Sequence, residues 1–173
     1  NSANGLPSLF YSVWRFVGME AMGTLSGMIL KTIPFFGSYC RGVAKMPLLG
    51  KMFGLSSRFL GRLLPRLAFL GFRKEASYEN AVWNWEVFLK LIGAQYDVIE
   101  TAPRQRLYTI RKCPAGHCRP EHLEACKRTM ELDNSLIETS GARLIVDKRF
   151  PIDGVCIERV VSNDISLSGT EVK

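Results

Sequence analysis

The chain has 173 residues, and 23 basic against 16 acidic side chains give it a net charge of +7. A hydrophobic content of 47% and a charged content of 23% exclude a wholly disordered chain. The charge is uneven: residues 1–73 hold nine basic side chains and one acidic one (net +8), and residues 74–173 hold the other 14 and 15 (net −1). We therefore divide the chain into a basic arm (1–73), a near-neutral domain (74–161) and a polar tail (162–173).

Charged residues interrupt the apolar arm too often for a membrane-spanning helix. Ten uncharged residues separate Glu20 from Lys31, and nine separate Lys31 from Arg41, whereas a spanning helix needs about 20 apolar residues in succession. A secretory signal also fits poorly, because the first basic residue, Arg15, follows the apolar stretch 9–14 instead of preceding it. We expect an intracellular protein without a transmembrane span.

Proline and glycine divide the arm into predicted helices over about 8–30, 38–46 and 55–72. In the last of these, Arg58, Arg62 and Arg66 recur every four residues and line one face, while apolar side chains such as Phe59 and Leu63 cover the rest. This pattern is typical of a helix that lies on a membrane surface or a hydrophobic partner protein, and we expect peripheral docking of this kind. The alternative is packing on the protein's own domain with a solvated basic face.

A nucleic-acid partner is not expected. The basic residues of the arm alternate with Leu, Phe and Met instead of polar side chains, and no nucleic-acid-binding motif occurs.

The domain predicts two helices and four strands. Ser77 caps a helix that runs to Leu91, and Gly93 ends it. Residues 96–100 and 106–112 read as strands, 120–139 as a helix that begins at Pro120, and 142–150 and 155–161 as strands. This order indicates an α+β fold, in which an antiparallel sheet of about four strands carries helices on one face.

The most specific chemical signal is the clustering of cysteine and histidine in the domain. Cys40 lies alone in the arm and is expected to be a small buried hydrophobe. The remaining thiols and both imidazoles fall within the domain, at Cys113, Cys118, His117, His122, Cys126 and Cys156.

The predicted elements could bring these groups together. Cys113 and Cys118 lie in a loop before a helix N-terminus, where free backbone N–H groups favour thiolates. His122 and Cys126 are four residues apart and share one helix face. Cys156 would join them if its face of the sheet, which it shares with Glu158, packs on that helix.

Three interpretations stay open. The four cysteines of the domain, with His122 as a substitute, could hold an iron–sulfur cluster or a single Zn or Fe ion, although C-x4-C-x7-C-x29-C matches neither zinc ribbons nor ferredoxin runs. Cys113 or Cys126 could instead be a catalytic thiol. The cysteines could also be structural, with Cys126 in the core or a Cys113–Cys118 disulfide.

Three short stretches of the domain, YTIRKCP, CKRTMELDNSL and GVCIERV, resemble the core of the L-2-amino-thiazoline-4-carboxylic acid hydrolase-like family. The resemblance covers residues 78–161, and the matching positions are Cys113-Pro114, Cys126, Asp133 and Gly154 with Cys156. It implies hydrolysis at the carbon of a cyclic amidine. A weaker resemblance, to iron-dependent carotenoid isomerase-like proteins, implies metal chemistry on an apolar molecule near a membrane. Cys118 and both histidines depart from the first pattern and favour metal.

We therefore expect a metal- or cluster-binding domain docked through its arm, with a role in electron transfer or metal chemistry. The first alternative is a hydrolase with Cys113 or Cys126 as nucleophile, His117 or His122 as base, and Asp133 or Glu121 to orient that base. The second alternative is a non-catalytic interaction subunit whose arm wraps a partner.

Overall fold

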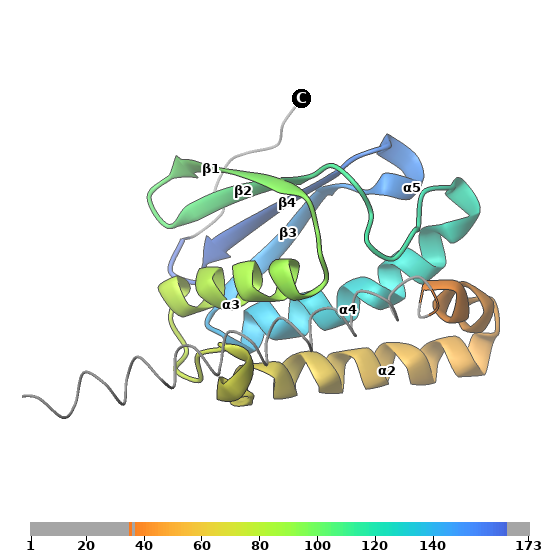
Figure 1. The fold of residues 1–173 in the computed structure, drawn as a ribbon, viewed down its shortest axis with the longest axis horizontal. Helices are drawn as coiled ribbons and strands as arrows, with labels where there is room; N and C mark the ends of the chain where they lie inside the picture. Colours follow the sequence, from red (N-terminus) through yellow and green to blue (C-terminus); the bar gives the residue numbers. More distant parts are fainter. Residues whose placement is uncertain (1–34, 36, 166–173) are drawn as a thin grey trace, which may run out of the picture.

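The structure is a computed structural model that describes residue 35 and residues 37–165. The helix predicted over 8–30 and most of the polar tail lie outside the described residues. The described part forms three layers, namely a four-stranded sheet, helices α3 (Tyr78–Leu91) and α4 (Leu123–Thr139) against one face of it, and helix α2 (Pro47–Leu63) on the far side of α4 (Figure 1). The predicted α+β fold is confirmed.

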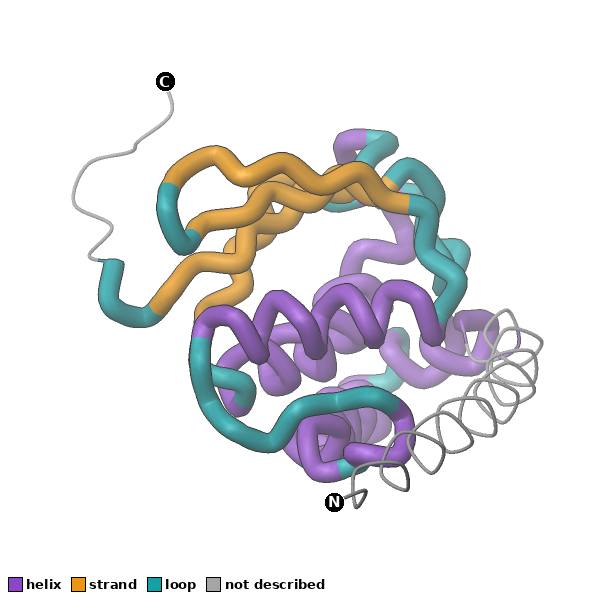
Figure 2. Tube along the Cα trace, turned by 60° about the vertical axis from the view of Figure 1, so that its left-hand side comes forward, coloured by secondary structure: helices purple, strands orange, loops and turns teal. Residues whose placement is uncertain are grey.

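The sheet consists of β1 (Tyr96–Ala102), β2 (Gln105–Ile110), β3 (Ala142–Lys148) and β4 (Cys156–Ser162). Its strand order is β1-β2-β4-β3, and every neighbouring pair is antiparallel. The tube in Figure 2 shows that the opposite face of the sheet carries no helix of the described chain. Each strand begins and ends within two residues of its predicted bounds. The period-two alternation of side chains is the pattern that predicted these strands, and it also decides which side chains face the helices.

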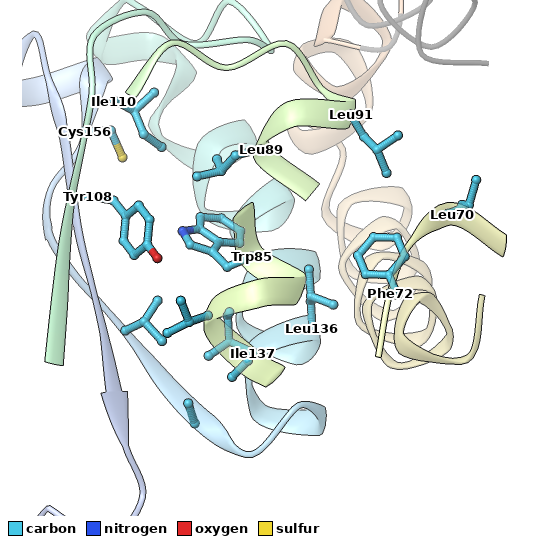
Figure 3. Packing of buried hydrophobic residues seen from close by; sticks show 14 residues of the cluster. Leu70, Phe72, Trp85, Leu89, Leu91, Tyr108, Ile110, Leu136, Ile137 and Cys156 are labelled. Atoms are coloured by element: carbon cyan, nitrogen blue, oxygen red, sulfur yellow. The ribbon is translucent and has the colours of Figure 1, made fainter. Parts of the chain in front are cut away.

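Helix α3 begins where the sequence predicted. The Ser77 hydroxyl oxygen accepts a hydrogen bond of 3.1 Å from the backbone N–H of Asn80. After the helix, Gly93 adopts a left-handed backbone conformation with a φ of 66°. The inward face of α3 places Trp85 and Leu89 against Tyr108 of β2, and the Trp85 and Tyr108 rings meet edge to face at 6.5 Å (Figure 3).

The loop after β2 leads into a short 3-10 turn, Pro120–His122, and α4 begins after it. The 3-10 turn therefore takes the place of the first turn of the helix that was predicted to start at Pro120. A four-residue helix, α5 (Phe150–Asp153), was not predicted, and β3 ends before it instead of continuing to Phe150. Pro151 at its first turn and Gly154 at its left-handed end explain the break. The chain then re-enters the sheet as β4 beside β3.

The arm departs most from prediction. A helix covers residues 37–44, close to the predicted 38–46, but the next helix begins at Pro47 instead of near 55 and ends at Leu63. Two 3-10 turns, Leu64–Arg66 and Ala68–Leu70, follow it, because Pro65 has no N–H to continue the α-helical pattern.

Helix α2 packs along α4 through small side chains. Its buried residues are Gly50, Gly54, Ser57 and Gly61. A Cβ on Gly61 would collide with the carbonyl oxygen of Leu132 and lie 2.9 Å from the Cβ of Ser135, so glycine permits the close approach of the two backbones. This part of the arm is therefore packed on the domain, as the alternative interpretation expected.

Candidate functional site

A cavity of about 600 Å³ lies between the inner face of the sheet, helices α3 and α4, and three residues of the arm, Phe35, Tyr39 and Leu60. Most of its wall is apolar, with Trp85, Phe88 and Leu89 from α3 and Ile92 directly after it. The wall also holds thiol, hydroxyl, imidazole and carboxyl groups, which belong to Cys113, His117, Cys126, Thr129, Asp133, Cys156 and Glu158. A largely apolar cavity with a few polar groups is the usual form of a small-molecule site.

Strand β4 places Cys156 and Glu158 on the cavity side of the sheet, because residues two apart share a face. The register sets Cys156 opposite Ile110 and Glu158 opposite Tyr108, and Figure 3 shows Cys156 facing the helices between Ile110 and Tyr108. The thiol of Cys156 donates a hydrogen bond of 3.0 Å to Oε1 of Glu158.

Glu158 is 1% exposed. Burial raises its pKa from 4.5 to about 7, although the hydrogen bond from Cys156 and the charge of Arg149 act in the opposite direction. The carboxyl group therefore exchanges its proton near neutral pH, the property that a general acid or base needs.

Asp133 is the second buried carboxyl group. It lies on α4, one turn after Thr129, and lines the same cavity. Burial raises its pKa well above the ordinary value, and the charge of Glu158 raises it further. Burial therefore favours the protonated form of Asp133, and an ionised Glu158 nearby favours that form further.

The geometry of the His117 ring defines its tautomer. The Thr129 hydroxyl donates to the carbonyl oxygen of Ala125 at 2.9 Å, so its oxygen accepts the hydrogen bond of 3.3 Å from Nε2 of His117. Nδ1 then carries a lone pair. Burial, with smaller contributions from the charges of Arg41 and His122, lowers the pKa of His117 to about 4, so the ring is neutral.

Three residues of the cavity wall have a buried polar atom without a hydrogen-bond partner among the described residues. These atoms are Nε1 of Trp85, Nδ1 of His117 and Oε2 of Glu158. Buried polar atoms in folded proteins are nearly always satisfied. A bound molecule with donor and acceptor groups would satisfy them.

The structure brings together three of the four predicted cysteine ligands, since Cys113, Cys126 and Cys156 line the cavity. Burial raises the pKa of all three thiols, that of Cys126 to about 12. Cys118 is exposed on its loop. His122 is not part of the cavity wall, although its ring centre lies 6.2 Å from that of His117.

The prediction of an iron–sulfur cluster or a single Zn or Fe ion is wrong for the described residues, because they contain no group of three or more His, Cys, Asp or Glu side chains that could hold a metal ion. The physical reason is the placement of the predicted ligands. Cys118 is exposed while the other thiols are buried or partly buried, Cys113 accepts the backbone N–H of His117, and Cys156 is bonded to Glu158. The ligand set predicted from sequence was Cys113, Cys118, Cys126, Cys156 and His122.

The residues predicted to dock the arm occupy different positions on α2 and the turn after it. Phe59 is exposed, as are Arg62 and Arg66, whereas Leu63 is half-buried. Arg58 is exposed too, but its guanidinium binds both carboxylate oxygens of Glu131 on α4, at 2.7 and 3.1 Å. Among the described residues, no helix is long and apolar enough to span a membrane.

No protein-family model, curated protein or solved structure matches this chain. The chemistry of the cavity wall is therefore the main guide to function.

Sequence reasoning missed the role of Glu158. The pattern of β4 already placed Glu158 on the same face as Cys156, and an acidic residue between buried apolar positions of a central strand is the signal that could have identified it. No comparable sequence signal marked Trp85 or Thr129 as residues of the cavity, because both residue types are common in helices.

Proposed function

We propose that the protein is an enzyme that performs general acid–base chemistry on a small, mainly apolar molecule bound in the cavity. One observation carries this proposal: two buried carboxyl groups, Asp133 and Glu158, line a single, mostly apolar cavity, where burial raises the pKa of both. Burying a carboxyl group without a paired cation costs stability. Such groups are concentrated at catalytic sites, where divergent pKa values assign the acid and the base.

Glu158 is suited to be the base and Asp133 the acid. The ionised Glu158 has a pKa of about 7 and an unpartnered Oε2 that can accept a proton. Burial raises the pKa of Asp133 and so favours the protonated form, which can donate a proton. Both carboxyl groups are buried, and burial strengthens their electrostatic interactions with a reacting molecule.

The reaction class that fits this pair is hydrolysis of a C–N bond, which the family resemblance also suggests. Glu158 would take a proton from a water molecule while the water oxygen bonds to the carbon of a cyclic amidine. Asp133 would give its proton to the ring nitrogen. The hydroxyl proton of the resulting tetrahedral intermediate passes to the same nitrogen as the C–N bond breaks, which leaves a carbonyl group and a free amine. Transfer of a proton from Glu158 to Asp133 then restores the starting state.

The burial and hydrogen bonds of the cavity favour acid–base catalysis by the two carboxyl groups over nucleophilic attack by a cysteine thiolate. Burial raises the pKa of Cys113 and of Cys126, so neither thiol is ionised near neutral pH. Within the described residues the ring of His117 bonds Thr129, and only its backbone N–H bonds the sulfur of Cys113. The Cys156 thiol, which bonds Oε1, orients the Glu158 carboxyl group.

The enzyme would work at a membrane surface. Residues 35–73 carry seven basic side chains and no acidic one, and this charge favours attachment to anionic lipids.

The test uses the purified full chain and a panel of cyclic amidines with apolar substituents, with the addition of one water molecule followed by mass spectrometry. Glu158→Gln and Asp133→Asn should each lower the rate by about 100-fold or more, the contribution typical of a general acid or base. Glu100→Gln, on exposed β1, is the matched control. Full activity in either cavity variant would contradict the proposal.

A further inference from the structure

Helix α2 places small residues on its inner face and large apolar residues on its outer face, which is the reverse of the usual arrangement. Its buried residues are small, and two of them, Gly54 and Gly61, face α4. Four large apolar side chains point outward: Leu48, Met52, Leu55 and Phe59, which are 72, 56, 63 and 66% exposed. Steps of four, three and four residues place these four on one face of the helix. An exposed apolar stripe of this kind marks an interaction surface.

Positive charge borders this stripe. Lys51 and Arg62 are exposed; Lys51 lies four residues before Leu55 and Arg62 three residues after Phe59, which places both at one edge of the stripe. Among the described residues no acidic side chain lies on α2, and Arg58, on the same edge, is already bound to Glu131. Cations beside an apolar stripe are the pattern of a helix that lies in a membrane interface.

The mouth of the cavity opens beside this stripe. Three residues of the cavity wall are also exposed, namely Phe35, Tyr39 and Leu60, at 79, 57 and 44%. Leu60 follows Phe59 on α2 and lies about 100° around the helix from it, beyond the edge of the stripe that is opposite Lys51 and Arg62, so the mouth lies beside the stripe.

We propose that the outward face of α2 docks on an anionic lipid membrane and that the cavity takes its apolar substrate from that membrane. The docking stands on the stripe and its cations alone. The identity of the substrate as a membrane-dissolved molecule rests on the proposed function. Flanking cations without acids match anionic head groups, and this charge complementarity favours lipid over an apolar protein groove.

Vesicle flotation of the full chain tests the docking. The protein should float with vesicles of phosphatidylcholine and phosphatidylserine and much less with phosphatidylcholine alone. Leu55→Ser with Phe59→Ser should reduce the bound fraction by about tenfold or more, and Lys51→Glu with Arg62→Glu should do the same. Ile99→Ser, at a side chain 58% exposed on β1, is the matched apolar control and should bind normally.

Three results would overturn the docking: no flotation with anionic vesicles, equal flotation of the α2 variants, or equal loss in the Ile99→Ser control. Light scattering adds a fourth. If the wild-type chain is a dimer and the α2 variants are monomers, a second copy covers the stripe instead of lipid.

The substrate route is tested with diphenylhexatriene dissolved in the vesicles. Protein released from them by high salt should carry the probe away, and Leu60→Asp at the mouth should carry about tenfold less, because a charged group there opposes entry of an apolar molecule. Equal amounts would refute the route.

Glu158→Gln should still extract the probe, so extraction without catalysis leaves this inference intact while the proposed function fails. Hydrolysis of soluble amidines by a chain that binds no vesicles would refute this inference and leave the proposed function standing.

Discussion

Replacing Glu158 with glutamine should stabilise the protein at neutral pH while removing its activity. The folded state holds this carboxyl group in a buried, mostly apolar site, where its charged form is disfavoured. Glutamine has nearly the same shape and carries no charge at any pH. The substitution therefore removes a cost of folding together with the proposed catalytic base.

The size and sign of the effect follow from the pKa. The ordinary pKa of Glu158 is 4.5, and its pKa in the folded protein is about 7. Between these two pH values the folded state therefore binds more protons than the unfolded state. The free energy of unfolding of the wild type then falls as pH rises through this range, by about 1.4 kcal/mol per pH unit. The total is about 3 kcal/mol, and this loss is fully expressed above the folded pKa of about 7 and absent below the ordinary pKa of 4.5.

Urea unfolding of wild type and Glu158→Gln between pH 4 and pH 8 measures this difference. Glutamine keeps a carbonyl oxygen that can accept the hydrogen bond from the Cys156 thiol, so the variant should match the wild type at pH 4 and be about 3 kcal/mol more stable at pH 8. Glu100→Gln, whose side chain is exposed, should show no such dependence on pH. A stability difference that does not change with pH would refute the assignment of Glu158 as a buried group that titrates near neutrality.

Three further experiments test the packing and the site. Gly61→Ala should destabilise the protein by about 1–2 kcal/mol in urea unfolding, because its Cβ meets the backbone of α4, whereas Gly42→Ala, with no atom within 4 Å, should stabilise it by about 0.5–1 kcal/mol; equal effects would argue against the close α2–α4 contact. The His117 ring signals in proton NMR should not titrate between pH 5.5 and pH 8, since its pKa is about 4; a midpoint near the ordinary value of 6.5 would show that the ring is not buried. Iodoacetamide should modify exposed Cys118 first and buried Cys126 only on unfolding, and similar rates for both would contradict the cavity.

The fold of the domain was predictable because local signals agree with it. The Ser77 cap, the period-two strands and the glycine at position 93 each define an element without reference to distant residues. The short helix α5 escaped prediction because four residues are too few for a periodic pattern, and Asp153-Gly154 reads equally well as a turn.

The orientation of α2 could not be predicted from hydrophobicity. An apolar face normally packs inward, but here Gly54 and Gly61 face α4, and a hydrophobic pattern ignores glycine. The prediction of a metal failed for a related reason. Spacing in the sequence shows that cysteines can meet, but it does not show which thiol is buried and which, like Cys118, faces solvent.

Two features of this chain run against its stability, the buried carboxyl pair in the cavity and the exposed apolar stripe on α2. The stripe and Glu158 lie on different layers, separated by α4 (Figure 1), so changes at the two places should be independent. Glu158→Gln should then lower the rate of hydrolysis by about 100-fold or more and leave vesicle binding unchanged, while Phe59→Ser should weaken vesicle binding and leave hydrolysis of soluble amidines unchanged. If the double variant instead showed a vesicle-binding loss different from that of Phe59→Ser alone, the cavity and the docking face would be coupled through α4, and the stripe would belong to the catalytic machinery.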